Sequence, residues 1–213
     1  MKNLNRRIIN SSPCRRCGTC CKKNSPSLHG IDSELIQSGA IPRNQLITYR
    51  KGEWINDNVA GQFIRLEQDI IKPIENKKDG YCTFYIVEDR SCGIYAHRPV
   101  ECQTQNCYDP EPFIQMYAKN RLTRRDIFPS NSAYYEMIEY HESRCPLSEL
   151  ENIRPFSNMI VSEQAISTFK EMIRFEFHFR YTLHKRTGLQ SSEMNFLLGR
   201  SVETILNHMQ VKL

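Results

Sequence analysis

The sequence predicts an α+β fold, in which a small cysteine-rich core with a short β-hairpin is followed by a C-terminal helical hairpin. Three observations lead to this prediction. Eight of the nine cysteines fall in two runs within residues 14–107. A turn signal at Asp79-Gly80 precedes a segment of strand-forming residues, Tyr81–Val87. After Ser162, apolar residues recur at helical spacing.

Short elements are expected before the hairpin. Residues 1–13 are predicted to be an arm that leads to the first cysteines. Asp32 is a candidate N-cap and Gly39 is a stop signal, so a short helix is expected between them. Segments 45–55 and 61–71 carry the alternation and the β-branched bias of strands.

The hairpin itself accounts for two of the cysteines. Its first strand is predicted over residues 81–87, and residues 88–91 reverse the chain, so that Cys82 and Cys92 come together. Residues 97–102 resemble a helical turn with proline at its start. This turn is expected to return the last two cysteines of the second run toward the hairpin.

From residue 110 onward the pattern is helical. Helices are expected over residues 111–125 and 132–142, then from the N-cap Ser162 to Gly188, and again from Ser192. The last two helices are expected to pack as an antiparallel hairpin, with their apolar stripe in the core rather than in a partner groove. That stripe comprises Ala165, Ile166, Phe169, Met172, Ile173, Phe177, Tyr181, Phe196, Leu197, Val202, Ile205, Leu206 and Met209. The expected organisation is a cysteine-cluster domain over residues 1–150 and a helical extension over residues 151–213.

Composition places the chain among ordinary globular proteins. It has 213 residues, of which 39% are hydrophobic and 25% charged, and no apolar stretch approaches the ~20 residues of a membrane span. The basic N-terminus has no apolar segment behind it, so it is not a secretory signal and a cytoplasmic location is expected. Thiols stay reduced there, and a cysteine pattern then indicates metal binding or catalysis rather than disulfides.

The first cysteine run is Cys14, Cys17, Cys20 and Cys21. Three thiolates at two-residue gaps with a distant fourth are typical of an iron–sulfur cluster, whereas a Cys-x2-Cys pair with a remote cysteine pair is typical of structural zinc. The spacing does not choose between them. Adjacent side chains point in different directions, so Cys20 and Cys21 need not share one centre.

The second run is Cys82, Cys92, Cys102 and Cys107, with gaps of nine, nine and four residues. These gaps suit a hairpin followed by a returning turn. Together the two runs supply eight candidate metal ligands for an iron–sulfur cluster or zinc, and Cys145 is left outside the scheme.

The charge pattern allows two interpretations. The formal net charge is +5, and four basic residues, Arg15, Arg16, Lys22 and Lys23, lie among the first cysteines. A metal centre with four thiolate ligands carries a net charge of about −2, so these cations can offset the thiolates and lower the pKa of their thiols. An RNA-binding patch is the less favoured interpretation, because no aromatic residues alternate with these charges in the sequence.

The combined pattern resembles a known family. It joins Cys14-x-x-Cys17-x-x-Cys20-Cys21 to Gly80-Tyr81-Cys82-Thr83-Phe84-Tyr85 and to Cys92-Gly93-Ile94-Tyr95-x-x-Arg98-Pro99-x-x-Cys102. Over residues 14–107 it resembles the YkgJ-like cysteine-cluster family, the CxxCxxCC zinc- or iron-chelating domain. The resemblance implies a bacterial or archaeal cytoplasmic metalloprotein, related to a flagellin lysine N-methylase with an iron–sulfur cluster, and it aligns Cys145 with a late family cysteine.

Two other residues of the second run bear on the chemistry. Arg98 can donate hydrogen bonds to thiolates as a group behind the ligands, or form a surface ion pair with Glu101 or Asp89. His97 is a candidate nitrogen ligand, although a lone histidine in a turn is more often solvated. The sequence contains no glycine-rich phosphate loop, no Gly-x-Ser-x-Gly elbow and no His-Glu-x-x-His helix, so enzymatic activity is left undecided.

Three hypotheses for function follow. The first is a cytoplasmic metal-binding protein that chelates an iron–sulfur cluster or zinc and supports protein modification or redox chemistry on an unknown protein partner. The alternative is a structural zinc-binding module for protein–protein or RNA interaction. The third is a thiol redox sensor that loses zinc as its cysteines oxidise. No membrane partner is expected, and nucleic acid is less favoured but left open.

Overall fold

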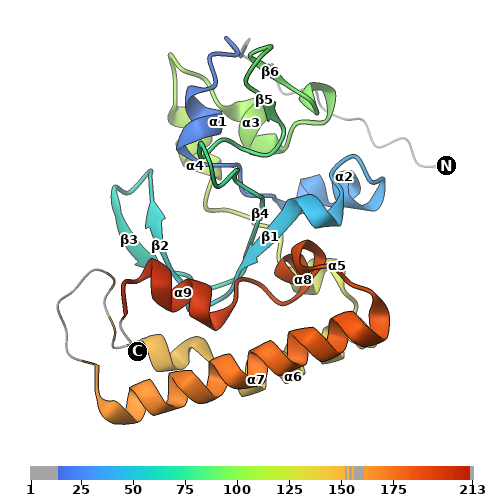
Figure 1. The fold of residues 1–213 in the computed structure, drawn as a ribbon. Helices are drawn as coiled ribbons and strands as arrows, with labels where there is room; N and C mark the ends of the chain where they lie inside the picture. The colour runs from blue at the N-terminus through green and yellow to red at the C-terminus, as the bar shows by residue number, and fades with distance from the viewer. Residues whose placement is uncertain (1–13, 152, 154, 156–160, 212–213) are drawn as a thin grey trace. The chain divides into compact units, whose positions relative to one another are not determined.

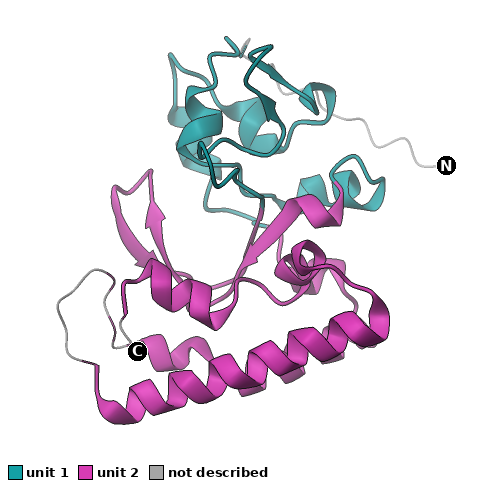
Figure 2. Ribbon diagram, viewed as in Figure 1, with its two compact units in different colours: residues 1–41, 73–121 teal, residues 42–72, 122–213 magenta. Residues whose placement is uncertain are grey.

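The computed structural model describes residues 14–151, 153, 155 and 161–211, so the predicted arm over residues 1–13 lies outside the described part. The chain forms two compact units, each built from two segments (Figure 2). Unit 1 comprises residues 1–41 and 73–121, and unit 2 comprises residues 42–72 and 122–213. Residue 150 lies inside unit 2, and the division into domains over 1–150 and 151–213 stays a prediction. The fold is α+β, as predicted.

Unit 1 consists of short elements joined by loops (Figure 1). Its helical elements are α1 (Thr19–Lys23), η1 (Gly30–Asp32), α2 (Ser33–Gln37), η3 (Tyr95–His97), α3 (Val100–Thr104) and α4 (Glu111–Met116). The helix expected between Asp32 and Gly39 is confirmed as α2, and Gly39 follows it with a φ of 77°. The helix expected over residues 111–125 is shorter than predicted, because α4 ends at Met116.

The predicted hairpin is present but much shorter. Strands β5 (Tyr85–Ile86) and β6 (Ser91–Cys92) are antiparallel, and Tyr85 lies opposite Cys92. Cys82 therefore does not pair with Cys92 across the ladder. Its backbone is bonded elsewhere, through a bridge to Glu75 and a hydrogen bond from its N–H to the carbonyl of Cys21.

Unit 2 contains two strand pairs. Strands β1 (Leu46–Tyr49) and β4 (Ile70–Pro73) form one pair, and β2 (Trp54–Asp57) and β3 (Gln62–Arg65) form an antiparallel pair with Trp54 opposite Arg65. Each predicted strand segment thus contains parts of two strands. Segment 45–55 overlaps β1 and β2, and segment 61–71 overlaps β3 and β4. Gly52, with a φ of 91°, lies in the turn between β1 and β2.

The helices of unit 2 are α5 (Arg124–Ile127), α6 (Ala133–Arg144), η4 (Leu147–Leu150), α7 (Glu163–Thr187), α8 (Ser191–Leu197) and α9 (Val202–His208). The predicted N-cap Ser162 is confirmed, since its hydroxyl accepts a hydrogen bond at 3.2 Å from the N–H of Ala165. The helix predicted over residues 132–142 is confirmed as α6, and the Ser132 hydroxyl caps it by accepting from the N–H of Tyr135 at 3.2 Å. The predicted last helix is two helices. It breaks at Gly199, where a φ of 81° is left-handed and a Cβ would lie 2.6 Å from Cγ of Arg50.

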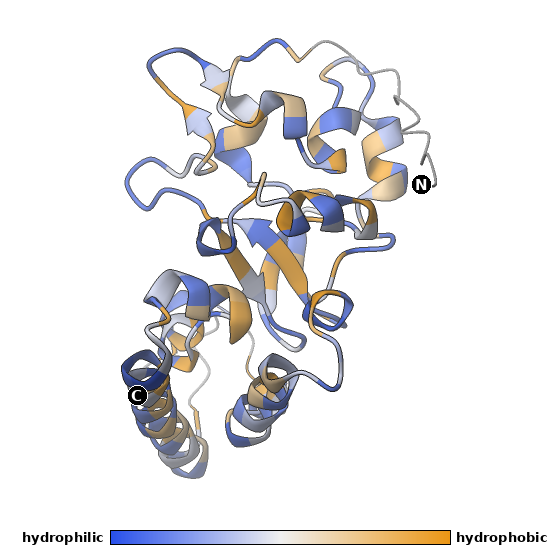
Figure 3. Ribbon diagram, turned by 90° about the vertical axis from the view of Figure 1, so that its right-hand side faces the viewer, coloured by the Kyte–Doolittle hydropathy of each residue, from blue (hydrophilic) through white to orange (hydrophobic). Residues whose placement is uncertain are grey.

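The core of unit 2 lies between the long helix and the C-terminal helices. Its buried residues include Phe169 and Met172 of α7 and Ile205 of α9, as predicted. The prediction is wrong for Phe177 and Tyr181, which are 67% and 55% exposed. At about 100° per residue, both point more than 100° away from the mean direction of Phe169 and Met172 around the helix. Figure 3 shows hydrophilic and hydrophobic residues on the helices of this unit.

Within the described residues, no helix has the length and apolar character needed to cross a membrane.

Candidate metal centre

The first cysteine run lies on a tight turn followed by α1. The backbone N–H of Arg16 donates to Sγ of Cys14 at 3.4 Å, and Arg16 has a left-handed φ of 56°. Gly18 has a φ of 76°, and a Cβ at this position would lie 2.5 Å from the hydroxyl oxygen of Tyr85. The chain can therefore pass under the tyrosine ring only because residue 18 is glycine.

Contacts join the first run to the second. The N–H of Cys82 donates to the carbonyl oxygen of Cys21 at 2.8 Å. The Tyr85 hydroxyl lies 3.5 Å from the carbonyl oxygen of Arg16, and its ring stacks on Tyr81 with centroids 4.8 Å apart. The two stretches of cysteines, separated by more than 60 residues in the sequence, thus lie against each other in unit 1.

Helix α3, which carries Cys102, is held by buried polar groups. Asp32 accepts a hydrogen bond from the N–H of Val100 at 2.9 Å, and the Glu101 carboxylate lies 3.0 Å from Nε2 of His29 and accepts from the N–H of Ser27 at 2.8 Å. Sequence reasoning gave Asp32 only as a candidate cap and assigned no specific role to His29. It missed their link to α3, because nothing in their spacing relates residues 29–32 to residues 100–101.

Four thiols, two from each run, lie close enough together that the charge on one affects the pKa of another. Cys21 is affected by Cys20, Cys82 and Cys102, and Cys102 is affected by Cys82 and Cys20. We call Cys20, Cys21, Cys82 and Cys102 the central thiols. Three further candidates lie beside them: Cys92 is close to Cys102 and to Cys14, and Cys17 is close to Cys20.

The central thiols differ in acidity. A hydrogen bond from Cys21 lowers the pKa of Cys20 to about 6, and the same hydrogen bond raises the pKa of Cys21. Burial raises the pKa of Cys102, and the neighbouring Cys82 and Cys92 raise it further. Cys20 is therefore more acidic than Cys21 and Cys102, because its thiolate accepts a hydrogen bond while burial and neighbouring thiolates disfavour the charged form of the other two.

Two arginines of the cysteine-rich segments, Arg16 and Arg98, lie over the same aromatic ring. The guanidinium carbon of Arg98 lies 3.7 Å from the centroid of the Tyr95 ring, and that of Arg16 lies 4.7 Å from the same centroid. Arg98 also lowers the pKa of Cys92, against the larger effect of burial, and forms no ion pair with Glu101 or Asp89, all three of which are described. Arg98 is therefore close enough to act on the Cys92 thiol, and its role behind metal ligands stays a prediction.

Three of the candidate residues are solvent-exposed, and one of them, Cys17, lies in the turn before α1. Cys107 lies in the loop after α3, and His97 lies at the end of η3. Beside the central thiols, a hollow of about 310 Å³ is lined by Cys82, Tyr81 and Tyr85 and by the acidic residues Asp79 and Glu88.

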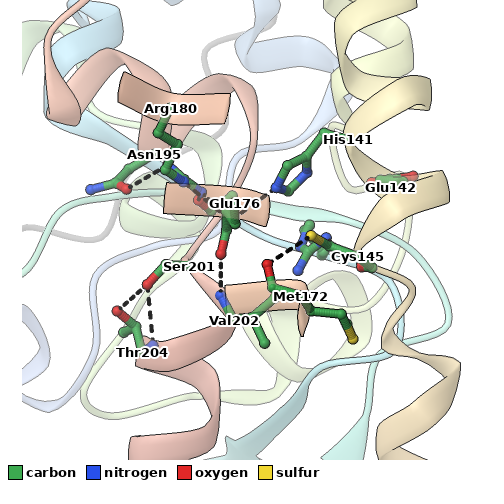
Figure 4. A network of polar contacts seen from close by, with 12 residues as sticks. His141, Glu142, Cys145, Met172, Glu176, Arg180, Asn195, Ser201, Val202 and Thr204 are labelled. Carbon is green, nitrogen blue, oxygen red and sulfur yellow. Dashed lines mark hydrogen bonds and ion pairs between the residues drawn. The ribbon is translucent and has the colours of Figure 1, made fainter. Parts of the chain in front are cut away.

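Cys145 belongs to unit 2 and is fully buried in its core. Its thiol donates to the carbonyl oxygen of Met172 at 3.8 Å, and burial raises its pKa to about 12 (Figure 4). Nearby, the buried Glu176 lies 2.9 Å from Nε2 of His141 and also accepts from Arg180 (Figure 4). Cys145 therefore belongs to a structural network.

The donor set fits a thiophilic metal. All nine cysteines lie in the described residues, and none forms a disulfide. The central thiols supply four sulfurs from two chain segments, and thiolate sulfur is the ligand that zinc and iron–sulfur clusters share. Within the part of the chain that the structure describes, however, no three His, Cys, Asp or Glu side chains are already arranged to hold an ion. The thiols are gathered but not in a coordinating arrangement.

These features define a cysteine-cluster domain with an α+β fold. The model of one protein family, CxxCxxCC, described as "Putative zinc- or iron-chelating domain", matches residues 13–146, which is more than half of the chain. The protein belongs to this family, and its metal is accordingly zinc or iron. No curated protein and no solved structure matches the sequence.

Proposed function

We propose that this protein binds its metal through the central thiols, Cys20, Cys21, Cys82 and Cys102. The observation that carries this proposal is the grouping of two thiols from each cysteine run, tied by the hydrogen bond between Cys82 and Cys21. The other four candidates, Cys14, Cys17, Cys92 and Cys107, extend the donor set. They supply the additional sulfur ligands that a second metal ion or a cluster requires.

The residues around the thiols have defined tasks in this proposal. Arg98 and Arg16 reduce the negative charge that accumulates when thiols become thiolates. The anchors Asp32 and Glu101 fix α3, so that Cys102 keeps its place beside Cys82. When bound, an iron–sulfur cluster supplies electron transfer, and zinc supplies a fixed fold or Lewis acidity. We infer that the metal centre supports redox or modification chemistry on a protein partner in the cytosol.

The test is metal and sulfide analysis of protein purified without oxygen. We expect a stoichiometric metal that is lost from Cys21→Ser, Cys82→Ser and Cys102→Ser. Cys145→Ser is the control, because this cysteine is more deeply buried than any of the three but lies in unit 2. Metal per folded molecule is compared across the variants. A brown protein with iron and acid-labile sulfide identifies a cluster, and a colourless protein with zinc identifies a zinc site.

Two results would overturn the proposal. One is wild-type protein that binds neither zinc nor iron with sulfide after anaerobic reconstitution. The other is a Cys145→Ser variant that loses metal as completely as Cys21→Ser while its circular dichroism spectrum is unchanged.

A further inference from the structure

The outer face of α7 carries two large aromatic side chains that the core does not use. Phe177 and Tyr181 are one helical turn apart and are 67% and 55% exposed. Neither belongs to the hydrophobic core of unit 2. An exposed pair of aromatic rings on one face of a helix that otherwise packs on a core makes that face a candidate binding surface.

Cations flank these rings along the same face. Lys170 and Arg174 precede Phe177 by seven and three residues, and Lys185 follows Tyr181 by four. At about 100° per residue, these five side chains and His178 lie within an arc of about 100°, over a length of about 22 Å from Lys170 to Lys185. We call this set of six residues the basic–aromatic stripe.

The charges of the stripe are available to a ligand. Lys170 and Arg174 are exposed and form no ion pair with any described residue, and Lys185 Nζ lies 5.5 Å from the centroid of the Tyr181 ring. Of the acidic residues of α7, Glu163 precedes the stripe, Glu171 lies at its edge and Glu176 is buried on another side of the helix. The arc of the stripe contains no carboxylate between Arg174 and Lys185.

Phe177 differs from the tyrosine rings around the cysteines, and from Tyr181, whose ring has Lys185 Nζ 5.5 Å from its centroid. In unit 1, Tyr95 is covered by Arg16 and Arg98, and Tyr108 is covered by Arg15 at 4.4 Å from its centroid. In the stripe, Phe177 contacts His178 edge-on, with an interplanar angle of 75°, and no described cation covers it. Its face is accordingly able to stack on a planar ligand.

We propose that the basic–aromatic stripe binds single-stranded nucleic acid. Lys170, Arg174 and Lys185 contact phosphates, and Phe177 and Tyr181 stack on bases. Exposed rings bracketed by cations are the combination by which proteins hold single strands without reading their sequence. This surface lies in unit 2, and the inference does not depend on the metal proposal.

Other occupants fit the stripe less well. A membrane-binding helix needs a broad apolar face, but the apolar face of α7 is committed to the core through Phe169, Met172 and Leu183. A second copy of the chain would bring one basic stripe against another and cost repulsion. An acidic protein would satisfy the cations and leave the rings without planar partners.

The test measures binding of fluorescein-labelled oligouridylate and oligothymidylate, about 12 nucleotides long, by fluorescence anisotropy. For three phosphate contacts, log K is expected to fall with log salt at a slope of about −2. Phe177→Ala and Tyr181→Ala should each weaken binding roughly 10-fold or more. Lys170→Gln and Arg174→Gln should each reduce the slope by about 0.7.

Two matched controls keep the test specific. Tyr181→Phe retains the ring and should bind like the wild type. Arg186→Gln removes an exposed charge from the same helix, more than 100° from Tyr181 around the axis, and should leave affinity within about 2-fold of the wild type. All of these side chains are exposed, so the variants should keep the wild-type circular dichroism spectrum.

The proposal is overturned if the wild type does not bind the oligonucleotides at low salt, or if Arg186→Gln weakens binding as much as Arg174→Gln. Stronger binding to vesicles with anionic lipid, or to polyglutamate, would also overturn it and would identify the other occupant.

Discussion

Replacing Gly18 with alanine should disturb the first cysteine run in a way that the structure defines. An alanine Cβ would lie 2.5 Å from the Tyr85 hydroxyl oxygen and 2.6 Å from its Cζ. The backbone φ of 76° is also one that alanine adopts only at a cost. The tyrosine ring must therefore leave its place on Tyr81, or the turn that carries Cys17 and Cys20 must open.

The expected cost has two parts. The left-handed backbone costs about 1–2 kcal/mol for a residue with a Cβ. Loss of the stacking between Tyr85 and Tyr81, whose centroids are 4.8 Å apart at an interplanar angle of 19°, costs about 0.5–1.5 kcal/mol more. Gly18→Ala should thus lower the free energy of unfolding by about 2–3 kcal/mol. If about 2 kcal/mol of this cost is specific to the metal-bound protein, metal binding should weaken roughly 30-fold.

The assay is urea unfolding followed by circular dichroism, combined with chelator competition for the metal. Gly39→Ala is the matched control, because Gly39 has a φ of 77° in the same unit and a Cβ there would meet nothing within 4 Å. It should show the backbone cost alone and no change in metal affinity. In a Tyr85→Ala background, Gly18→Ala should lose about 1 kcal/mol of its effect.

The reasoning is refuted if Gly18→Ala costs no more than Gly39→Ala, or if the effects of Gly18→Ala and Tyr85→Ala are additive within about 0.5 kcal/mol.

Three further predictions concern stability. Glu176→Gln should cost about 3–5 kcal/mol, because it breaks the buried ion pair with Arg180, whereas the exposed Glu171→Gln should change the free energy of unfolding by less than about 0.5 kcal/mol; urea unfolding at pH 7 distinguishes them. Burial, with the charges of Arg50 and Arg180, lowers the pKa of His141 from 6.5 to about 4. The unfolded chain then binds the proton more tightly, so stability should be greatest above pH 6.5 and fall by up to about 3 kcal/mol toward pH 4, and a flat profile would contradict this. Arg16→Gly should be more stable than Arg16→Ala by about 1 kcal/mol, since only glycine relieves the left-handed φ of 56°; equal melting curves would contradict it.

Local signals in the sequence predicted several elements correctly. Ser132 and Ser162 start α6 and α7, and Gly188 ends α7 with a φ of 77°. These features depend on hydrogen bonds within four residues, so the chain encodes them locally. The long-range pairing of Cys82 with Cys21 and Glu75 has no such local signal, and for that reason the predicted hairpin was too long.

Periodicity alone also could not assign the faces of α7. The apolar residues from Ala165 to Tyr181 follow helical spacing, but the last two drift around the axis and leave the core. Which arc of a helix is buried depends on the elements that pack against it, here α6, α8 and α9.

The sequence by itself determined that this protein collects thiols, because eight cysteines in two closely spaced runs supply soft donors whatever the fold. Only the tertiary structure decided which thiols are neighbours: a backbone hydrogen bond and the close approach of Gly18 to Tyr85 bring Cys20 and Cys21 to Cys82 and Cys102. Tertiary packing also buried Cys145 in the other unit and left Phe177 and Tyr181 in solvent. The physical reason is that the type of a residue determines which metals it can bind, whereas contacts between residues far apart in the chain determine which of these residues lie close together.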